Sequence, residues 1–147
     1  MPKGKTHMMV GAGAGLISLA AIPPERPTES LAVLLGRITG GLVGGCIPDW
    51  LEPATSPRHR QSAHSFIAGG SVYGLCAAAH KAETYCLDWA VELSKRAEVE
   101  TDAVKRTFLL LTASTLRFIG SFLVGGAVGY VSHLVLDLFT PAGLPLI

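Results

Sequence analysis

The 147-residue sequence has few charged residues, few aromatic side chains and few cysteines. Charged residues make up 16% of the chain, against about 25% in a typical soluble domain. With so few charged residues, a soluble domain of this size could not cover its surface with polar groups, so a membrane protein is favoured. The net charge of +1 and the lack of a basic stripe argue against nucleic-acid binding, which needs clustered cations to neutralise phosphates. Three widely spaced cysteines, Cys46, Cys76 and Cys86, indicate reduced apolar thiols rather than disulfides or a thiolate metal site.

Apolar and small residues are abundant instead. Hydrophobic residues make up 49% of the chain and glycine occurs 17 times, which excludes a disordered chain. The length allows a single domain, residues 1–147. Four apolar stretches predict four helices: Met8–Ile22, Leu31–Ile47, Ser65–Ala79 and Phe108–Phe139. The first three are shorter than the roughly 20 residues that span a bilayer, whereas the fourth is long enough.

A further amphipathic helix is predicted over Ala82–Ala97. Apolar residues, Tyr85 and Trp89 among them, recur there every three or four positions, and charged residues such as Glu83 fall on other faces. This segment either extends the third helix or lies along a membrane interface. Prolines mark an irregular loop over residues 47–63. We therefore predict an all-α fold, a four-helix membrane-embedded bundle with an extra amphipathic helix.

Glycine spacing favours close helix packing in this bundle. The second and fourth stretches each contain a GxxxG pair, Gly41 to Gly45 and Gly125 to Gly129. In membranes such pairs let helix backbones approach closely. The Gly-rich helices are therefore candidate contacts with a second copy of the chain or with another membrane protein.

Residues that can bind metal ions occur near the ends of the apolar stretches. In an up-down bundle, the starts of the first and third helices and the ends of the second and fourth lie together. This end receives six candidates: His7, Asp49, His59, His64, His133 and Asp137. His80 falls at the opposite end. Imidazole and carboxylate ligands without thiolate suit Zn²⁺, Mn²⁺, Fe²⁺ or Ni²⁺.

Each candidate also has a purely structural interpretation. Asp49 and Glu52 have the spacing of a helix capping box. His133 and Asp137, four residues apart on one helical face, can hydrogen-bond to each other in a polar core. The other three histidines can be loop or terminal residues. Two isolated cations within apolar stretches are expected to have structural partners that the sequence does not identify: Arg37 and Arg117.

The combined motifs resemble one bacterial family. They are Thr6-His7, Gly45-Cys46-Ile47-Pro48-Asp49, His59-Arg60-x3-His64-Ser65 and Gly129-Tyr130-x2-His133-Leu134-x2-Asp137-x2-Thr140. Together they are similar to the membrane-bound metal-dependent hydrolase family, often called the YdjM-like or LexA-binding inner-membrane hydrolase family. The resemblance extends from His7 to Pro145. The His133-x3-Asp137 element is also distantly similar to the zinc-dependent phospholipase C and P1 nuclease group.

The resemblance implies a multi-pass protein of the bacterial inner membrane that binds one or two divalent ions, zinc above all. It implies five metal ligands: His7, Asp49, His64, His133 and Asp137. The family's usual Pro-Asp-x-Asp loop has Leu51 at its last position here, so a second carboxylate is lost unless Glu52 replaces it. The chain would then bind fewer metals or act on a different substrate.

Two functions are consistent with these residues. In the first, the protein is a metal-dependent hydrolase, because a bound ion lowers the pKa of its water toward about 7. Glu52 is the candidate general base or a further ligand, and His59 is a candidate proton shuttle. Arg58 and Arg60 are candidate phosphate-binding residues, which favours a phosphoester such as a phospholipid headgroup, or else they are a basic membrane anchor.

In the second, the protein is a non-catalytic membrane subunit with a structural metal site or a polar network. A metal transporter or sensor is less consistent with the sequence, because its polar residues would follow a path at mid-helix depth. Basic residues on the side of the candidate site, Lys3, Lys5, Arg58 and Arg60, predict that the site faces the cytoplasm.

Overall fold

The computed structural model describes residues 4–24, 31–51 and 66–139, apart from the side chains of residues 66–70, 72 and 73. Its elements are α1 (Gly4–Ala21), α2 (Leu31–Gly44), α3 (Ile47–Leu51), α4 (Phe66–Val99) and α5 (Ala103–Leu138). The described ranges contain no strand, so the predicted all-α fold is confirmed.

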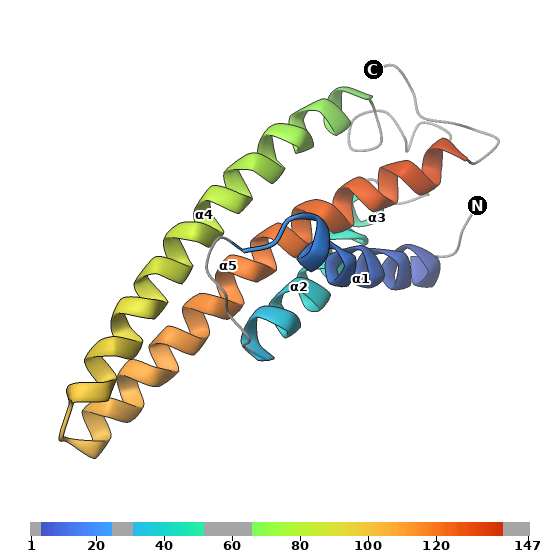
Figure 1. Ribbon diagram of the computed structural model, residues 1–147. Helices are drawn as coiled ribbons and strands as arrows, with labels where there is room; N and C mark the ends of the chain where they lie inside the picture. The colour runs from blue at the N-terminus through green and yellow to red at the C-terminus, as the bar shows by residue number, and fades with distance from the viewer. Residues whose placement is uncertain (1–3, 25–30, 52–65, 140–147) are drawn as a thin grey trace.

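The long helix α5 is the centre of the bundle. It contacts every other helix, and α1 also packs on α2. Figure 1 shows α4 and α5 as a long antiparallel hairpin that extends beyond α1 and α2 toward its connecting turn. Asp102 begins α5 as its N-cap, because its Oδ1 atom accepts hydrogen bonds from the backbone N–H groups of Val104 and Lys105 at 2.9 and 3.2 Å.

The structure decides one alternative that the sequence left open, and it changes several of the expected helix boundaries. Residues 66–99 form one continuous helix, so the amphipathic segment extends the third helix. The start of the predicted loop at Ile47 is wrong, because Ile47–Leu51 is the short helix α3. A proline is tolerated in the first turn of a helix, where its missing N–H group has no intrahelical partner, and this permits Pro48 in α3.

Small residues bring α1, α2 and α5 into backbone contact. A Cβ atom added at Gly15 or Gly125 would collide with the carbonyl oxygen of Arg37. One added at Gly41 would collide with the carbonyl oxygen of Gly11, and one at Gly129 with that of Gly41. The predicted GxxxG pairs therefore serve packing within the chain. Their use by a partner protein or a second copy stays a prediction.

Arg37 of α2 and Glu83 of α4 form a fully buried ion pair, to which serines of α1 and α5 are hydrogen-bonded. We call these four residues, Ser18, Arg37, Glu83 and Ser121, the arginine layer. The Arg37 guanidinium donates to both carboxylate oxygens of Glu83, at 3.2 and 2.6 Å, and to Ser18 Oγ at 2.8 Å. Ser121 Oγ donates to Glu83 Oε1 at 2.8 Å. Arg37 Nη2 also donates to the carbonyl of Ile22, directly after α1, at 3.0 Å. The layer links α1, α2, α4 and α5.

The arginine layer revises the interpretation of the amphipathic segment. Glu83 is fully buried, so its placement on a polar face was wrong, and it is the structural partner expected for Arg37. Two aromatic residues of the predicted apolar face, Tyr85 and Trp89, are 65% and 45% exposed. Arg117, the other isolated cation, also has a structural partner. Its Nη2 atom donates a hydrogen bond to the hydroxyl group of Ser94 at 2.9 Å.

Candidate metal centre

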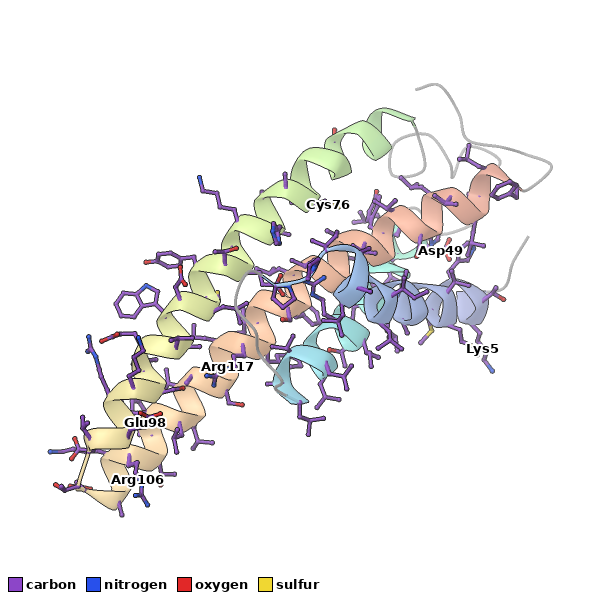
Figure 2. The ribbon with its side chains drawn as sticks, in the orientation of Figure 1. Lys5, Asp49, Cys76, Glu98, Arg106 and Arg117 are labelled. Carbon is purple, nitrogen blue, oxygen red and sulfur yellow. The ribbon has the colours of Figure 1, made fainter. Side chains whose placement is uncertain are left out.

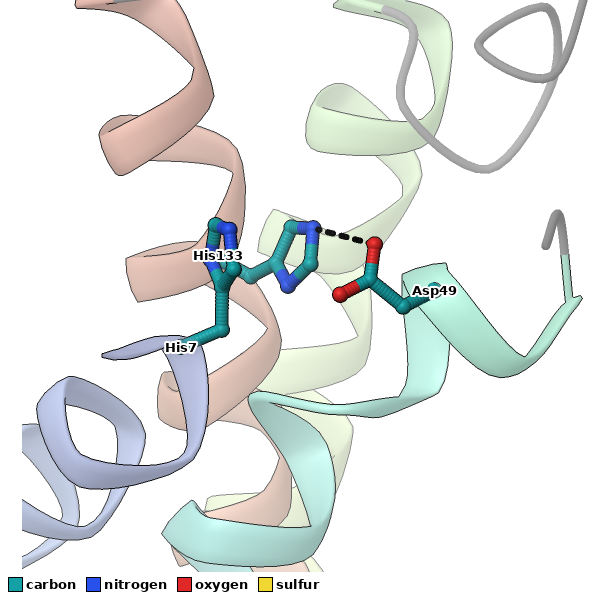
Figure 3. Close-up of side chains that lie close together, drawn as sticks. All are labelled: His7, Asp49 and His133. Carbon is teal, nitrogen blue, oxygen red and sulfur yellow. Dashed lines mark ion pairs between the residues drawn. The ribbon is translucent and has the colours of Figure 1, made fainter. Parts of the chain in front are cut away.

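Four of the predicted ligands meet at one end of the bundle, and we call His7, Asp49, His133 and Asp137 the His–Asp cluster. His7 comes from the first turns of α1, Asp49 from α3, and His133 and Asp137 from the last turns of α5. One ligand atom from each of His7, Asp49 and His133 lies within 4.8 Å of the others. Figure 3 shows these three side chains converging from three separate helices.

The ring of His133 is oriented by a backbone carbonyl. His133 Nδ1 lies 2.7 Å from the carbonyl oxygen of Gly45, and a carbonyl only accepts, so Nδ1 carries the hydrogen. In the neutral ring Nε2 is then an acceptor, and it faces Asp49 Oδ1 and Asp137 Oδ2, each at 3.7 Å. Metal-binding histidines are commonly held in this way, with one ring nitrogen bonded to a carbonyl and the other directed at the ion.

His7 completes the cluster from the other face of His133. The two rings stack, with centroids 3.9 Å apart and planes at 23°. His7 Nε2 lies 3.9 Å from Asp137 Oδ1. His7 Nδ1 is buried and finds no hydrogen-bond partner within the described part of the chain. A buried polar atom without a partner is uncommon in native proteins and often indicates a missing ion or water.

Gly45 positions two sides of the cluster at once. Its carbonyl oxygen holds His133, and its lack of a side chain lets the start of α1 approach. A Cβ atom at Gly45 would lie 2.6 Å from the carbonyl oxygen of His7. Sequence reasoning did not single out Gly45 as a site residue. Two sequence features could have indicated it, because Gly45 belongs to a GxxxG pair and is the first residue of the motif that contains Asp49.

The cluster is closed on three sides and more open at α3. The side chains of His7, His133 and Asp137 are 4% exposed or less, whereas that of Asp49 is 41% exposed. Figure 2 places Asp49 and Lys5 at the end of the bundle away from Glu98 and Arg106. Asp49 is therefore the most exposed side chain of the cluster.

The donor set fits a divalent cation. Two imidazoles and two carboxylates suit zinc and its first-row neighbours, and the carboxylates supply two negative charges. Ligand atoms at about 2.0–2.1 Å from a tetrahedral zinc ion lie roughly 3.3 Å apart. Three imidazole–carboxylate separations in the cluster are 3.7–3.9 Å, and the ligand atoms of His7, Asp49 and His133 lie within 4.8 Å of one another, so side-chain rotations would be needed to close the site.

Thiolate does not contribute to this donor set. The three cysteines are free, as the sequence predicted. Cys46 is the one nearest to the cluster in sequence, and it is buried. Burial raises the pKa of its thiol, and the neighbouring Asp49 carboxylate raises it further, so the thiol stays protonated.

Several predicted residues lie outside the described parts of the chain. They are the candidate base Glu52, the candidate shuttle His59, the fifth ligand His64 and the candidate phosphate-binding residues Arg58 and Arg60. Their roles stay predictions. His80 lies outside the His–Asp cluster, as expected, and its Nδ1 atom is 3.6 Å from Glu83 Oε2 in the arginine layer.

One protein-family model covers the whole chain. The model of the YdjM inner membrane protein family matches residues 1–147. The chain belongs to this family. No curated protein and no solved structure matches it. The YdjM assignment indicates an inner membrane protein. Among the described helices, α5 alone is long and apolar enough to cross a membrane, whereas the apolar α2 has 14 residues.

Proposed function

We propose that this inner membrane protein binds a divalent cation, zinc above all, through the four residues of the His–Asp cluster. We also propose that it hydrolyses a membrane lipid, with a phosphoester as the favoured scissile group. His64 and Glu52 are the candidates for further ligands, and a second ion would need them. When bound, the ion supplies a water of lowered pKa and polarises the scissile group.

One observation supports this proposal above the others. The acceptor nitrogen of His133 faces carboxylate oxygens of Asp49 and Asp137 at equal distances of 3.7 Å. The three atoms carry negative charge or a lone pair, so a cation among them is favoured by all three. The Nδ1 atom of His7, which has no hydrogen-bond partner among the described residues, is a second indication, because a ring rotation would bring a nitrogen to the same ion.

The chain's own residues have separable roles in this chemistry. Gly45 and the stacked His7 ring fix the direction of His133, so its Nε2 atom needs little reorganisation to bind an ion. The exposed side of Asp49 is where the substrate enters. Glu52 is proposed as the general base and His59 as the proton shuttle. Arg58 and Arg60 are proposed to bind the phosphate.

Metal content and activity test the proposal together. Protein purified from membranes is analysed for metals beside the variants His133→Gln, Asp137→Asn and the matched control His80→Gln. We expect near-stoichiometric metal in the wild type and the control, and a loss in the two cluster variants. Turnover on a panel of phospholipids should fall with metal content. Unchanged metal in both cluster variants would refute the site, and a filled site without turnover would refute the hydrolase.

A non-catalytic membrane subunit is the second candidate. The burial of three of the four cluster residues favours it, because structural metal sites are closed whereas catalytic sites keep an open position. The rate of metal loss to a chelator distinguishes the two. A catalytic site open at Asp49 should lose its ion within minutes and recover activity on re-addition, whereas a structural site should lose it only as the protein unfolds.

We further propose a multi-pass topology with the His–Asp cluster on the cytoplasmic side. Lys5 lies at the same end of the molecule as Asp49, and short basic segments favour the cytoplasm. Thiol labelling of a cysteine substituted for Lys5 in intact spheroplasts tests the orientation. Labelling only after the membrane is permeabilised supports it, and labelling of intact spheroplasts overturns it.

A further inference from the structure

An apolar groove with a volume of about 370 Å³ lies between α4 and α5. Its walls include Leu75, Ala78 and Ala82 from α4 and Phe122 and Leu123 from α5, and it reaches Ile47 and Tyr130. Among the described residues that line it, Tyr130 alone has a polar side-chain group, its hydroxyl. Water needs two or more polar partners in a cavity, so this groove favours hydrocarbon.

The groove runs from the arginine layer to the His–Asp cluster. At one end, Ala82 and Phe122 are the sequence neighbours of Glu83 and Ser121. At the other end, Ile47 is two residues before Asp49, and Tyr130 is one helical turn before His133. Tyr130 follows Phe122 by eight positions, which is about 12 Å along α5. One end of the groove is therefore formed by residues that closely precede Asp49 and His133 in the chain, and the groove is long enough for a substantial part of an extended chain.

The surroundings identify the occupant. One wall is α5, the described helix that meets the requirements for a membrane span, and the family is one of inner membrane proteins. An apolar groove on such a helix is suited to hydrocarbon rather than to water. Alanine and glycine form half of the described lining, and their small side chains leave space between the two helices for an unbranched hydrocarbon chain.

We propose that this groove binds one fatty-acyl chain of a membrane lipid and thereby places the lipid's polar head at the His–Asp cluster. The proposal rests on the proposed function, because it makes that lipid the substrate. It assigns selection of the substrate to its hydrocarbon chain as well as to its head. Ala78 is the residue best suited to test it, because a larger side chain there would fill the groove from α4.

The test compares two neighbouring alanines on α4. Ala78 lines the groove, whereas the equally exposed Ala77 lines a separate surface beside His80 and Lys81. Wild type, Ala78→Trp and Ala77→Trp are placed in phosphatidylethanolamine nanodiscs that contain some lipid with a diazirine in one acyl chain. After irradiation, mass spectrometry locates the labelled residues. We expect the wild type to be labelled at groove residues such as Leu123. This labelling should fall about tenfold in Ala78→Trp and should not fall in Ala77→Trp.

Further measurements keep the test decisive. Circular dichroism and metal content report whether each variant folds, and Ala78→Leu, a smaller change, should reduce labelling by an intermediate amount. Equal labelling of folded Ala78→Trp and wild type would overturn the groove, and so would cross-linking of the groove to a second protein chain. Groove labelling in a wild-type protein that binds no metal would overturn the proposed function while supporting the acyl-chain site.

Discussion

The arginine layer and the His–Asp cluster share helices α1 and α5, but they differ in charge balance and in spacing. In the arginine layer one guanidinium faces one carboxylate, with donor–acceptor distances of 2.6–3.2 Å. In the His–Asp cluster two carboxylates face two imidazoles at 3.7–3.9 Å, beyond hydrogen-bond range. The first arrangement pairs its charges internally, whereas the second brings together two imidazoles and two carboxylates, a donor set that suits a cation.

The two clusters are also related by position along the helices. His7 precedes Ser18 by 11 residues on α1, and Ser121 precedes His133 by 12 residues on α5. At 1.5 Å of rise per residue these intervals are about 17 Å. Gly15, Gly41 and Gly125 lie in the intervening part of the bundle and keep the backbones in contact. A rigid glycine-packed segment therefore separates a structural polar layer from a candidate functional one.

The largest effect is expected from breaking the arginine layer. Glu83→Ala leaves the Arg37 guanidinium buried without its counter-ion, which costs about 3–5 kcal/mol of unfolding free energy. The double variant Arg37→Met/Glu83→Leu removes both charges and should recover most of that loss. Thermal or denaturant unfolding in detergent measures both. Equal instability of the single and double variants would contradict the assignment of a paired structural layer.

A smaller effect is expected when the His–Asp cluster binds its ion. Zinc at 100 times its dissociation constant should stabilise the wild type by about 2.7 kcal/mol, because the ion binds only the folded state. His133→Gln should abolish this gain without the losses seen for Glu83→Ala. Unfolding curves with and without zinc measure it. A gain that persists in His133→Gln would place the ion elsewhere.

A substitution in the glycine segment between the clusters should lower the unfolding free energy by an amount comparable to or smaller than the gain from zinc. Gly41→Ala places a Cβ atom against the backbone of α1, so we expect a loss of about 1–3 kcal/mol. Gly13→Ala is the matched control, because a Cβ atom there meets nothing within 4 Å. It should stabilise α1 by up to about 1 kcal/mol. Similar unfolding midpoints for the two variants would argue against close α1–α2 packing.

The smallest effect is expected in the hairpin beyond α1 and α2. Ser94→Ala removes the hydrogen bond from Arg117 at a partly exposed position, so the loss should be about 0.5–1.5 kcal/mol. Metal content should not change. A loss as large as that of Glu83→Ala would mean that the two isolated arginines have equivalent structural roles, contrary to their different burial.

The sequence predicted the helical architecture and the meeting of the His–Asp cluster because both follow from simple rules. Apolar stretches define the helices, and up-down order brings the start of α1 and the end of α5 together. The burial of Glu83 was not predictable from its own helix, because it depends on partners from other helices, Arg37 of α2 and Ser121 of α5. The bond from His133 to Gly45 depends on the turn after α2, whose backbone geometry leaves no pattern in the sequence.

X-ray absorption spectroscopy at the metal edge of protein purified from membranes tests the central claim most directly. The account predicts ligation by nitrogen and oxygen only, with imidazole scattering from His7 and His133 that is lost in His133→Gln. Sulfur ligation, or a wild-type spectrum without imidazole, would contradict it.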